Sequence, residues 1–179
     1  EGNCPTRLEI AIGFEAYSET IRNEQFLKGL SLQAVEDLAS KIAPFGFGLK
    51  CYFMLKPVVE MSSAEAIADI GLAVEYLDQL ARRLEIPINM HLNPTYVARG
   101  TVLETAFAEG RFAPPTIKDV IEAALKAEGR MLKLFLGLSD EGLAVAGGSF
   151  REPGDEDTVA QLEAFNRTQD FSLLHALIE

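Results

Sequence analysis

Four apolar runs recur along the chain at similar intervals, and this recurrence constrains the fold more than any other feature. The runs cover residues 8–14, 49–55, 87–92 and 131–138, and they begin 41, 38 and 44 residues apart. Short, nearly unbroken apolar runs are typical of strands buried in a parallel sheet. Their spacing leaves room for the helical crossover that two parallel strands need between them.

The segments between the runs carry apolar residues at helical spacing. Three such stripes cover residues 32–42, 67–84 and 117–125. Ser62 and Glu65 have the spacing of a capping box before the second stripe, and Thr116 is placed to cap the third. We therefore predict an α/β fold built on an open parallel βα sheet with right-handed crossovers. Because four βα units do not close an eight-stranded barrel, the sheet is either open or a partial, half TIM-like barrel.

The C-terminal part of the chain has a different pattern. Residues 139–142 predict a turn, and residues 143–146 are expected to return as a short strand in a hairpin-like end. A C-terminal helix is expected over residues 157–165, with a break at 166–170 before the apolar residues 171–177. No composition shift divides the chain, so residues 1–179 are expected to form a single domain.

Charge and cysteine content narrow the class of protein. With 16 basic and 27 acidic residues the net charge is −11, which argues against a large phosphate-binding face. No run of eighteen apolar residues is present, so no membrane span is expected. Cys4 and Cys51 lie too far apart for a metal-site spacing, and Cys51 is expected to be a buried, reduced thiol. These features favour a cytoplasmic setting. The chain begins without Met, so we expect it to be part of a longer protein.

Polar residues follow the ends of the predicted strands, where ligands bind in parallel βα folds. They are Glu15, Lys56, Asn93, Thr95, Ser139 and Asp140. The amine of Lys56 is expected to need a partner because it stands between Leu55 and Pro57, and either Glu15 or an anionic ligand could supply one. Polar residues are also common in loops that bind nothing, so spacing alone names no reaction.

The histidines and tyrosines give weaker signals. His91 lies within an apolar run, where packing in the core is a commoner role than ligand binding. His175 has no partner at metal-site spacing. Tyr17, Tyr52 and Tyr96 could line a cleft, but aromatic residues near strand ends usually serve packing.

The order of several short motifs resembles the later half of a radical SAM core. The motifs are Gly13-Phe-Glu-Ala-Tyr-Ser-Glu-Thr-Ile-Arg22, Leu27-Lys-Gly29 and Gly46-Phe-Gly-Leu-Lys-Cys-Tyr-Phe-Met-Leu-Lys-Pro57. They are most similar to the group that contains the Elongator catalytic subunit, the methylthiotransferases and the archaeosine-synthase radical SAM subunit. Residues 93–104, 110–115 and 165–170 resemble the archaeosine type best. The resemblance covers about residues 8–175.

This resemblance implies a partial barrel that binds S-adenosylmethionine beside a [4Fe–4S] cluster. Glu15 would then lie near the ribose of the cofactor, at the end of the fourth strand. Lys28 would approach the methionyl carboxylate. The strand over residues 50–54 would lie under the adenine, with Lys56 at its mouth, and Asn93 would stand near the ligand at the end of the next strand.

The chain departs from the family in two respects: the cluster-binding CxxxCxxC motif is absent from it, and so are the first three strands. Cys4 and Cys51 cannot replace that motif, since a cluster needs several thiolates close together. We therefore expect a C-terminal fragment of a radical SAM Fe–S oxidoreductase that acts on RNA or a small substrate. Alone it should be inactive, with no cofactor bound, and its partner would be the missing N-terminal half.

Two other hypotheses remain from the sequence. The chain could be a stand-alone α/β module that binds a small anion through Lys56 and Glu15 without radical chemistry. It could also be an assembly domain that forms a homo-oligomer through an open sheet edge, because unpaired strand edges tend to be covered.

Overall fold

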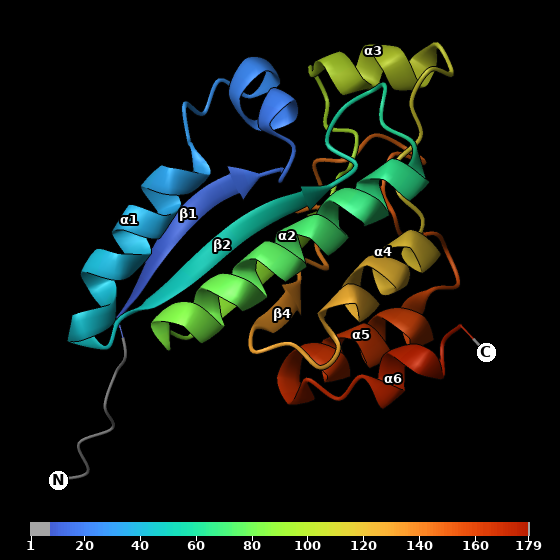
Figure 1. Cartoon of the computed structure of the whole chain (residues 1–179). Coiled ribbons are helices and arrows are strands. Elements are labelled where there is room, and N and C mark those ends of the chain that lie inside the picture. The colour runs from blue at the N-terminus through green and yellow to red at the C-terminus, as the bar shows by residue number, and fades with distance from the viewer. Residues whose placement is uncertain (1–7, 179) are drawn as a thin grey trace, which may run out of the picture.

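The computed structural model describes residues 8–178, and four of its strands form one parallel sheet (Figure 1). The strands are β1 (Glu9–Glu15), β2 (Gly48–Leu55), β3 (Ile88–Pro94) and β4 (Lys133–Leu136). They lie side by side in chain order, and each pairing is parallel. The predicted α/β fold with an open parallel sheet is therefore confirmed.

Helices connect the strands and follow the last one. They are α1 (Leu32–Ile42), α2 (Ser63–Leu84), α3 (Val102–Ala108), α4 (Ile117–Ala124), α5 (Glu156–Thr168) and α6 (Ser172–His175). A short π-helix, η1 (Thr20–Gln25), follows β1, and 3-10 turns follow α1 (η2, Ala43–Phe45) and α4 (η3, Leu125–Ala127). No helix within residues 8–178 combines the length and the apolar character that crossing a membrane requires.

The predicted capping box starts α2. The Ser62 hydroxyl accepts a hydrogen bond from the amide of Glu65 at 3.2 Å, and the Glu65 carboxylate accepts one from the amide of Ser62 at 2.8 Å. Thr116 and Asp119 make the same pair of bonds at the start of α4. Each pair satisfies two backbone donors that a helix start otherwise leaves without partners.

The helices cover one face of the sheet. Along β2 the side chains of Leu49, Cys51, Phe53 and Leu55 are fully buried and join a core with residues of α1, α2 and α4. Figure 1 shows α2 running alongside β2, with α1 beside β1. The alternate residues of the strands face the other way and stay partly exposed, because side chains alternate between the two faces of a strand.

Two side-chain amides cover the outer edge of β4. Asn166 donates to the carbonyl of Leu136 and accepts from its amide, both at 2.8 Å. Gln169 makes the equivalent pair of bonds with Leu134, at 2.9 and 3.0 Å. These two residues of the α5 C-terminus occupy the backbone groups that a fifth strand would use. Among the described residues no strand pairs with the outer edge of β1.

The predicted hairpin after β4 is wrong. Residues 143–146 do not form a strand; instead Ala144 makes an isolated antiparallel bridge with Ala98, in the loop after β3. The Val145 amide donates to the Val97 carbonyl at 2.9 Å, and the Val97 amide donates to the Gly148 carbonyl at 2.7 Å. The reason is packing, since Val97 is fully buried in a small second cluster to which Val145 adds its side chain.

The C-terminal helix is longer than predicted. The break expected at residues 166–170 is confined to its end, because α5 continues through Thr168 and stops at Gln169, whose φ of 58° is left-handed. The side chains of Asn166 and Gln169 bond to β4 from the C-terminal end of α5.

Candidate functional site

An ion pair stands at the carboxyl end of β1. Lys28 Nζ lies 2.6 Å from Glu15 Oε1, and the two side chains are 33% and 19% exposed. Gly13 makes room for this pair, because a Cβ there would lie 2.8 Å from the carboxylate oxygen and 3.1 Å from the amine. Glu15 and Lys28 were predicted separately and not as a pair, so the ion pair is a finding of the structure. The ligand roles of the two residues stay predictions.

The backbone of Glu15 is strained. Its φ is 67°, and the register between β1 and β2 shifts between Gly13 and Glu15. A left-handed conformation is uncommon for a residue with a side chain and costs about 1 kcal/mol or more. Lys56, at the end of β2, has a φ of 59°. Two neighbouring strands thus end in a strained residue that bears a charge, and such residues cluster at functional sites.

Arg22 stabilises the turn after Glu15 through its side chain. Its side chain is among the largest fully buried ones, and its guanidinium donates to the carbonyls of Ala16, Tyr17 and Leu30 at 3.2, 2.5 and 2.7 Å. The guanidinium also lies 5.3 Å from the centre of the Phe14 ring. Planar donors in a fork suit several carbonyls at once.

Asp69 of α2 stabilises the same turn by accepting hydrogen bonds from its backbone amides. Its carboxylate accepts from the amides of Tyr17 and Ser18 at 2.8 and 2.7 Å. Burial raises the pKa of Asp69, and these two bonds together with nearby Arg22 offset part of that rise. The roles of Arg22 and Asp69 were not predicted from the sequence. One signal was available, since Asp69 stands within the apolar stripe of α2 beside Ile70.

Lys56 does not pair with Glu15, so that part of the prediction is wrong. Its amine instead lies 5.6 Å from the centre of the Phe112 ring, in a cation–π contact. The left-handed backbone at Lys56 and the Glu15–Lys28 ion pair together account for the difference. Phe112, which is buried, comes from the loop after α3, and sequence spacing gave no sign of that neighbour.

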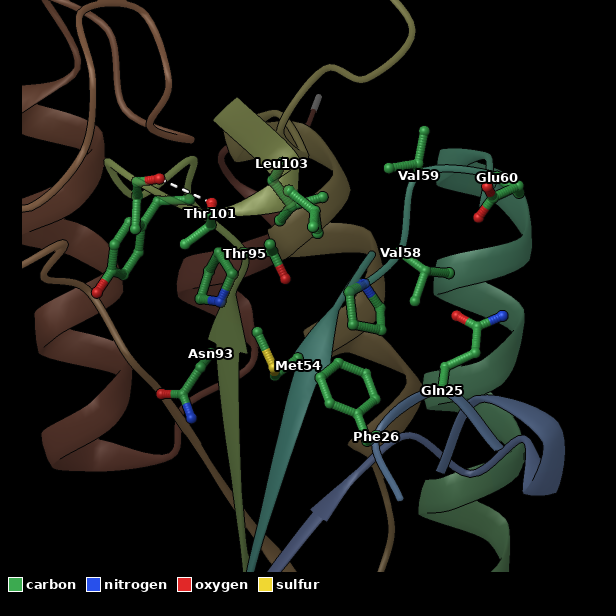
Figure 2. Close-up of a pocket in the computed structure, with 15 residues that line it drawn as sticks. Gln25, Phe26, Met54, Val58, Val59, Glu60, Asn93, Thr95, Thr101 and Leu103 are labelled. Carbon is green, nitrogen blue, oxygen red and sulfur yellow. Dashed lines mark hydrogen bonds between the residues drawn. The ribbon is translucent and has the colours of Figure 1, made fainter. Parts of the chain in front are cut away.

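A cavity of about 620 Å³ opens at the carboxyl ends of β2 and β3 (Figure 2). Its lining residues come from η1 and the residue after it, the ends of β2 and β3, the loops that follow these strands, and the start of α3. They are Gln25, Phe26, Met54, Pro57, Val58, Val59, Glu60, Asn93, Pro94, Thr95, Tyr96, Ala98, Thr101, Val102 and Leu103. Asn93 and Thr95, both predicted as strand-end polar residues, therefore lie at one cavity, whereas Glu15, Lys28 and Lys56 do not line it.

Ser139 and Asp140 lie elsewhere. The Asp140 carboxylate accepts from the Gly142 amide at 3.1 Å and lies 3.7 Å from a guanidinium nitrogen of Arg151. The bond from the Gly142 amide is the main cause that lowers its pKa. The prediction that the polar residues of all four strand ends meet in one cleft is therefore wrong. Glu15 and Lys56 do not line the cavity, and the loop after β4 turns toward α5.

His91 is a packed residue on the face of the sheet that the helices leave uncovered. Its ring lies 5.1 Å from the rings of both Tyr52 and Phe135, which are its register partners on β2 and β4. Burial, with a smaller effect from Lys50, lowers its pKa to about 4. His175 pairs with Glu128 at 3.0 Å on the surface.

The other tyrosines divide between packing and the cavity. Tyr17 packs against Tyr76, with ring centres 5.8 Å apart, and Tyr96 lines the cavity.

Cys51 is a buried free thiol, and burial raises its pKa to about 12. Cys4 lies outside the described residues.

The chain is 29% identical over 167 residues to archaeosine synthase subunit beta of Methanosarcina acetivorans, which covers 90% of this chain and 45% of that protein. The predicted resemblance to the archaeosine-synthase group is confirmed. The chain is also 24% identical over 176 residues to an uncharacterized protein of Methanocaldococcus jannaschii, covering 96% and 46% of the two. It therefore spans less than half the length of these relatives. No protein-family model matches it.

The described residues do not fit an iron–sulfur cluster. Residues 8–178 hold no group of three or more His, Cys, Asp or Glu side chains that could bind a metal. Their one cysteine, Cys51, is a protonated thiol at neutral pH, whereas clusters are held by thiolates. Any cluster would need ligands from outside this segment.

Proposed function

We propose that the chain forms the C-terminal half of a radical SAM core, in a cytoplasmic oxidoreductase that modifies RNA or a small substrate. Two findings support this proposal: the similarity to archaeosine synthase subunit beta, and a charged pair at the end of a parallel strand. The observation that carries it is the Glu15–Lys28 pair. The whole protein would supply the cluster, and this segment would supply part of the cofactor site.

The chemistry of the pair fits S-adenosylmethionine. The methionyl part of that cofactor carries a carboxylate, which Lys28 would bind, and its ribose carries hydroxyls that can donate to Glu15. The strained turn supports the proposal, because Arg22 and Asp69 fix the backbone that directly follows Glu15. Asn93 and Lys56 would stand at the next two strand ends, beside the pair.

The two edges of the sheet support a half barrel that extends in one direction. Asn166 and Gln169 occupy the outer backbone groups of β4, so further strands would add beside β1. The uncovered face of the sheet, which carries Tyr52, His91 and Phe135, would then face the barrel interior. Parallel sheets are commonly covered on both faces, which leaves this face in need of a partner.

The contacts support the radical SAM proposal better than the alternative of a stand-alone module that binds a small anion through Lys56 and Glu15. Lys56 contacts Phe112, Glu15 already has a cationic partner, and no basic residue lines the main cavity in the described part of the chain. An anion would meet little positive charge at that cavity. A homo-oligomer that forms through a sheet edge would have to use the edge at β1, because Asn166 and Gln169 occupy the edge at β4.

The proposal is tested on the full-length protein, reconstituted with iron and sulfide without oxygen and reduced with dithionite. Formation of 5′-deoxyadenosine from S-adenosylmethionine is the expected result. Lys28→Met should raise the KM for S-adenosylmethionine about tenfold or more, the worth of one charge-assisted hydrogen bond. Lys118→Met removes only a surface pair with Glu122 and serves as the matched control. If the protein with an intact cluster forms no 5′-deoxyadenosine, the proposal is wrong.

A further inference from the structure

The uncovered face of the sheet carries a lysine that has no carboxylate partner among the described residues. Lys50 is the third residue of β2, and its amine lies 5.6 Å from the centre of the Tyr52 ring. Its charge also helps to lower the pKa of His91, the register partner of Tyr52. The amine of Lys50 therefore acts on the aromatic row that Tyr52, His91 and Phe135 form across the sheet. Within residues 8–178 it forms no ion pair.

The carboxylates of β1 that reach this face are already engaged. Glu9 accepts a hydrogen bond from the side-chain amide of Asn89, which alternates with His91 on the same face of β3. Glu15, at the other end of β1, pairs with Lys28 at 2.6 Å. Neither carboxylate is left for Lys50.

Covering this face would change the environment of Lys50. Its side chain is now partly exposed, so water solvates the amine. An element packed on the aromatic row would remove that water, and an ammonium group buried without a partner is costly. The Tyr52 ring offsets part of this cost, but a cation–π contact is generally worth less than a hydrogen bond between charged groups. A covering element that suits this face therefore brings a carboxylate to Lys50.

The part of the protein that precedes this chain fits as the covering element. The chain matches only 45% and 46% of the two relatives, so proteins of this kind have room for a second half. The chain enters the sheet at β1, whose outer edge is the unpaired one among the described residues. A second copy of the chain fits poorly, because its carboxylates on this face are engaged and it would add another Lys50.

We infer that the part of the protein before residue 1 packs on the uncovered face, with an Asp or Glu carboxylate against Lys50 and apolar side chains against the aromatic row. For the identity of that part, the missing half of the core, this rests on the proposed function. Lys50 would then act as an anchor between the two halves, near the amino end of β2 and away from the cavity at the carboxyl ends of the strands.

Cross-linking of the full-length protein with a water-soluble carbodiimide tests the pair. The reagent joins an amine to a carboxylate in contact with it, with loss of one water, and mass spectrometry identifies the linked peptides. We expect Lys50 to be joined to an Asp or Glu that lies before residue 1. Lys118 is the control, because its amine lies 3.7 Å from Glu122 on the surface and should link to that residue. Lys50→Arg keeps the charge but has no amine to couple, so the Lys50 link should disappear.

Two further measurements separate a carboxylate partner from a cover without one. Acetylation needs a free amine, so Lys50 should react about tenfold more slowly than Lys118, the effect of one hydrogen bond between charged groups. Lys50→Met should unfold about 5 °C below the full-length wild type, because its partner carboxylate is left buried without a cation. Under a cover without a carboxylate, Lys50→Met would instead unfold at a higher temperature than the wild type, since no charge would be buried.

Three results would overturn the inference. They are a Lys50 link only to residues within 1–179, which includes a second copy; acetylation of Lys50 as fast as that of Lys118; and unfolding of Lys50→Met at or above the wild-type temperature. None of these measurements needs a cluster, S-adenosylmethionine or turnover. A protein that forms 5′-deoxyadenosine without the Lys50 link refutes this inference alone, whereas a linked protein that forms none refutes only the proposed function.

Discussion

Replacing Arg22 with Met tests the account of the strained turn most directly. The guanidinium donates to three carbonyls, but the Leu30 carbonyl also accepts from the Asn23 side chain at 3.2 Å. Met therefore removes the side-chain donor from the buried carbonyl of Ala16 and from the partly buried carbonyl of Tyr17. Each such loss costs about 1–3 kcal/mol, and Met recovers some stability because no charge is buried. We expect the free energy of unfolding to fall by about 3 kcal/mol, a large part of a typical total.

Urea unfolding followed by circular dichroism measures this change. Arg111→Met is the control, because Arg111 forms only an exposed pair with Glu109 and should contribute less than about 0.5 kcal/mol. Arg22→Lys should fall between the two, since an amine retains the charge without the planar fork. If Arg22→Met unfolds within about 1 kcal/mol of the wild type, the turn is held by other contacts and our reasoning about Arg22 is wrong.

Three further predictions follow from single contacts. Because the pKa of His91 is about 4 in the folded chain, the unfolded chain takes up the proton first as the pH falls below about 6.5. The free energy of unfolding should therefore decline as the pH falls below about 6.5 and level off near pH 4. We expect a total loss of about 1–2 kcal/mol, because the ring is partly exposed. In urea titrations at these pH values, His91→Gln should not show this loss. Cys51, with a pKa of about 12, should react with a thiol reagent only as fast as the chain opens, and fast reaction in native buffer would contradict its burial. Ser62→Ala should lower the free energy of unfolding by about 1 kcal/mol, measured by the same urea assay, and an unchanged value would show that the capping box contributes nothing.

The strands and main helices were predictable because their signals are local. An apolar run such as residues 49–55 and a capping box at Ser62 and Glu65 depend on neighbours a few residues away in the sequence. Glu15 was predictable as a strand-end carboxylate for the same reason. Its partner Lys28 came only from the family resemblance, since nothing local ties residue 28 to residue 15.

Apart from those of Arg22, the contacts that sequence reasoning missed join distant segments. Asp69 meets the turn at residues 17–18 across more than fifty positions, and Lys56 meets Phe112 across a similar distance. The loop at residues 143–146 was assigned to β4 by proximity in sequence, yet it pairs beside Ala98 because Val97 and Val145 bury together. Such choices depend on which apolar surfaces meet in three dimensions.

The amides of Asn166 and Gln169 limit how copies of this segment can associate. Head-to-tail addition of strands needs two free edges on each copy, one to give and one to receive, and repeated addition of that kind produces filaments. With the β4 edge occupied, an edge-to-edge contact could form only between two β1 strands. Such a contact uses the same surface on both copies and is closed, so it stops at two. The α5 C-terminus thereby protects the sheet against open-ended polymerisation.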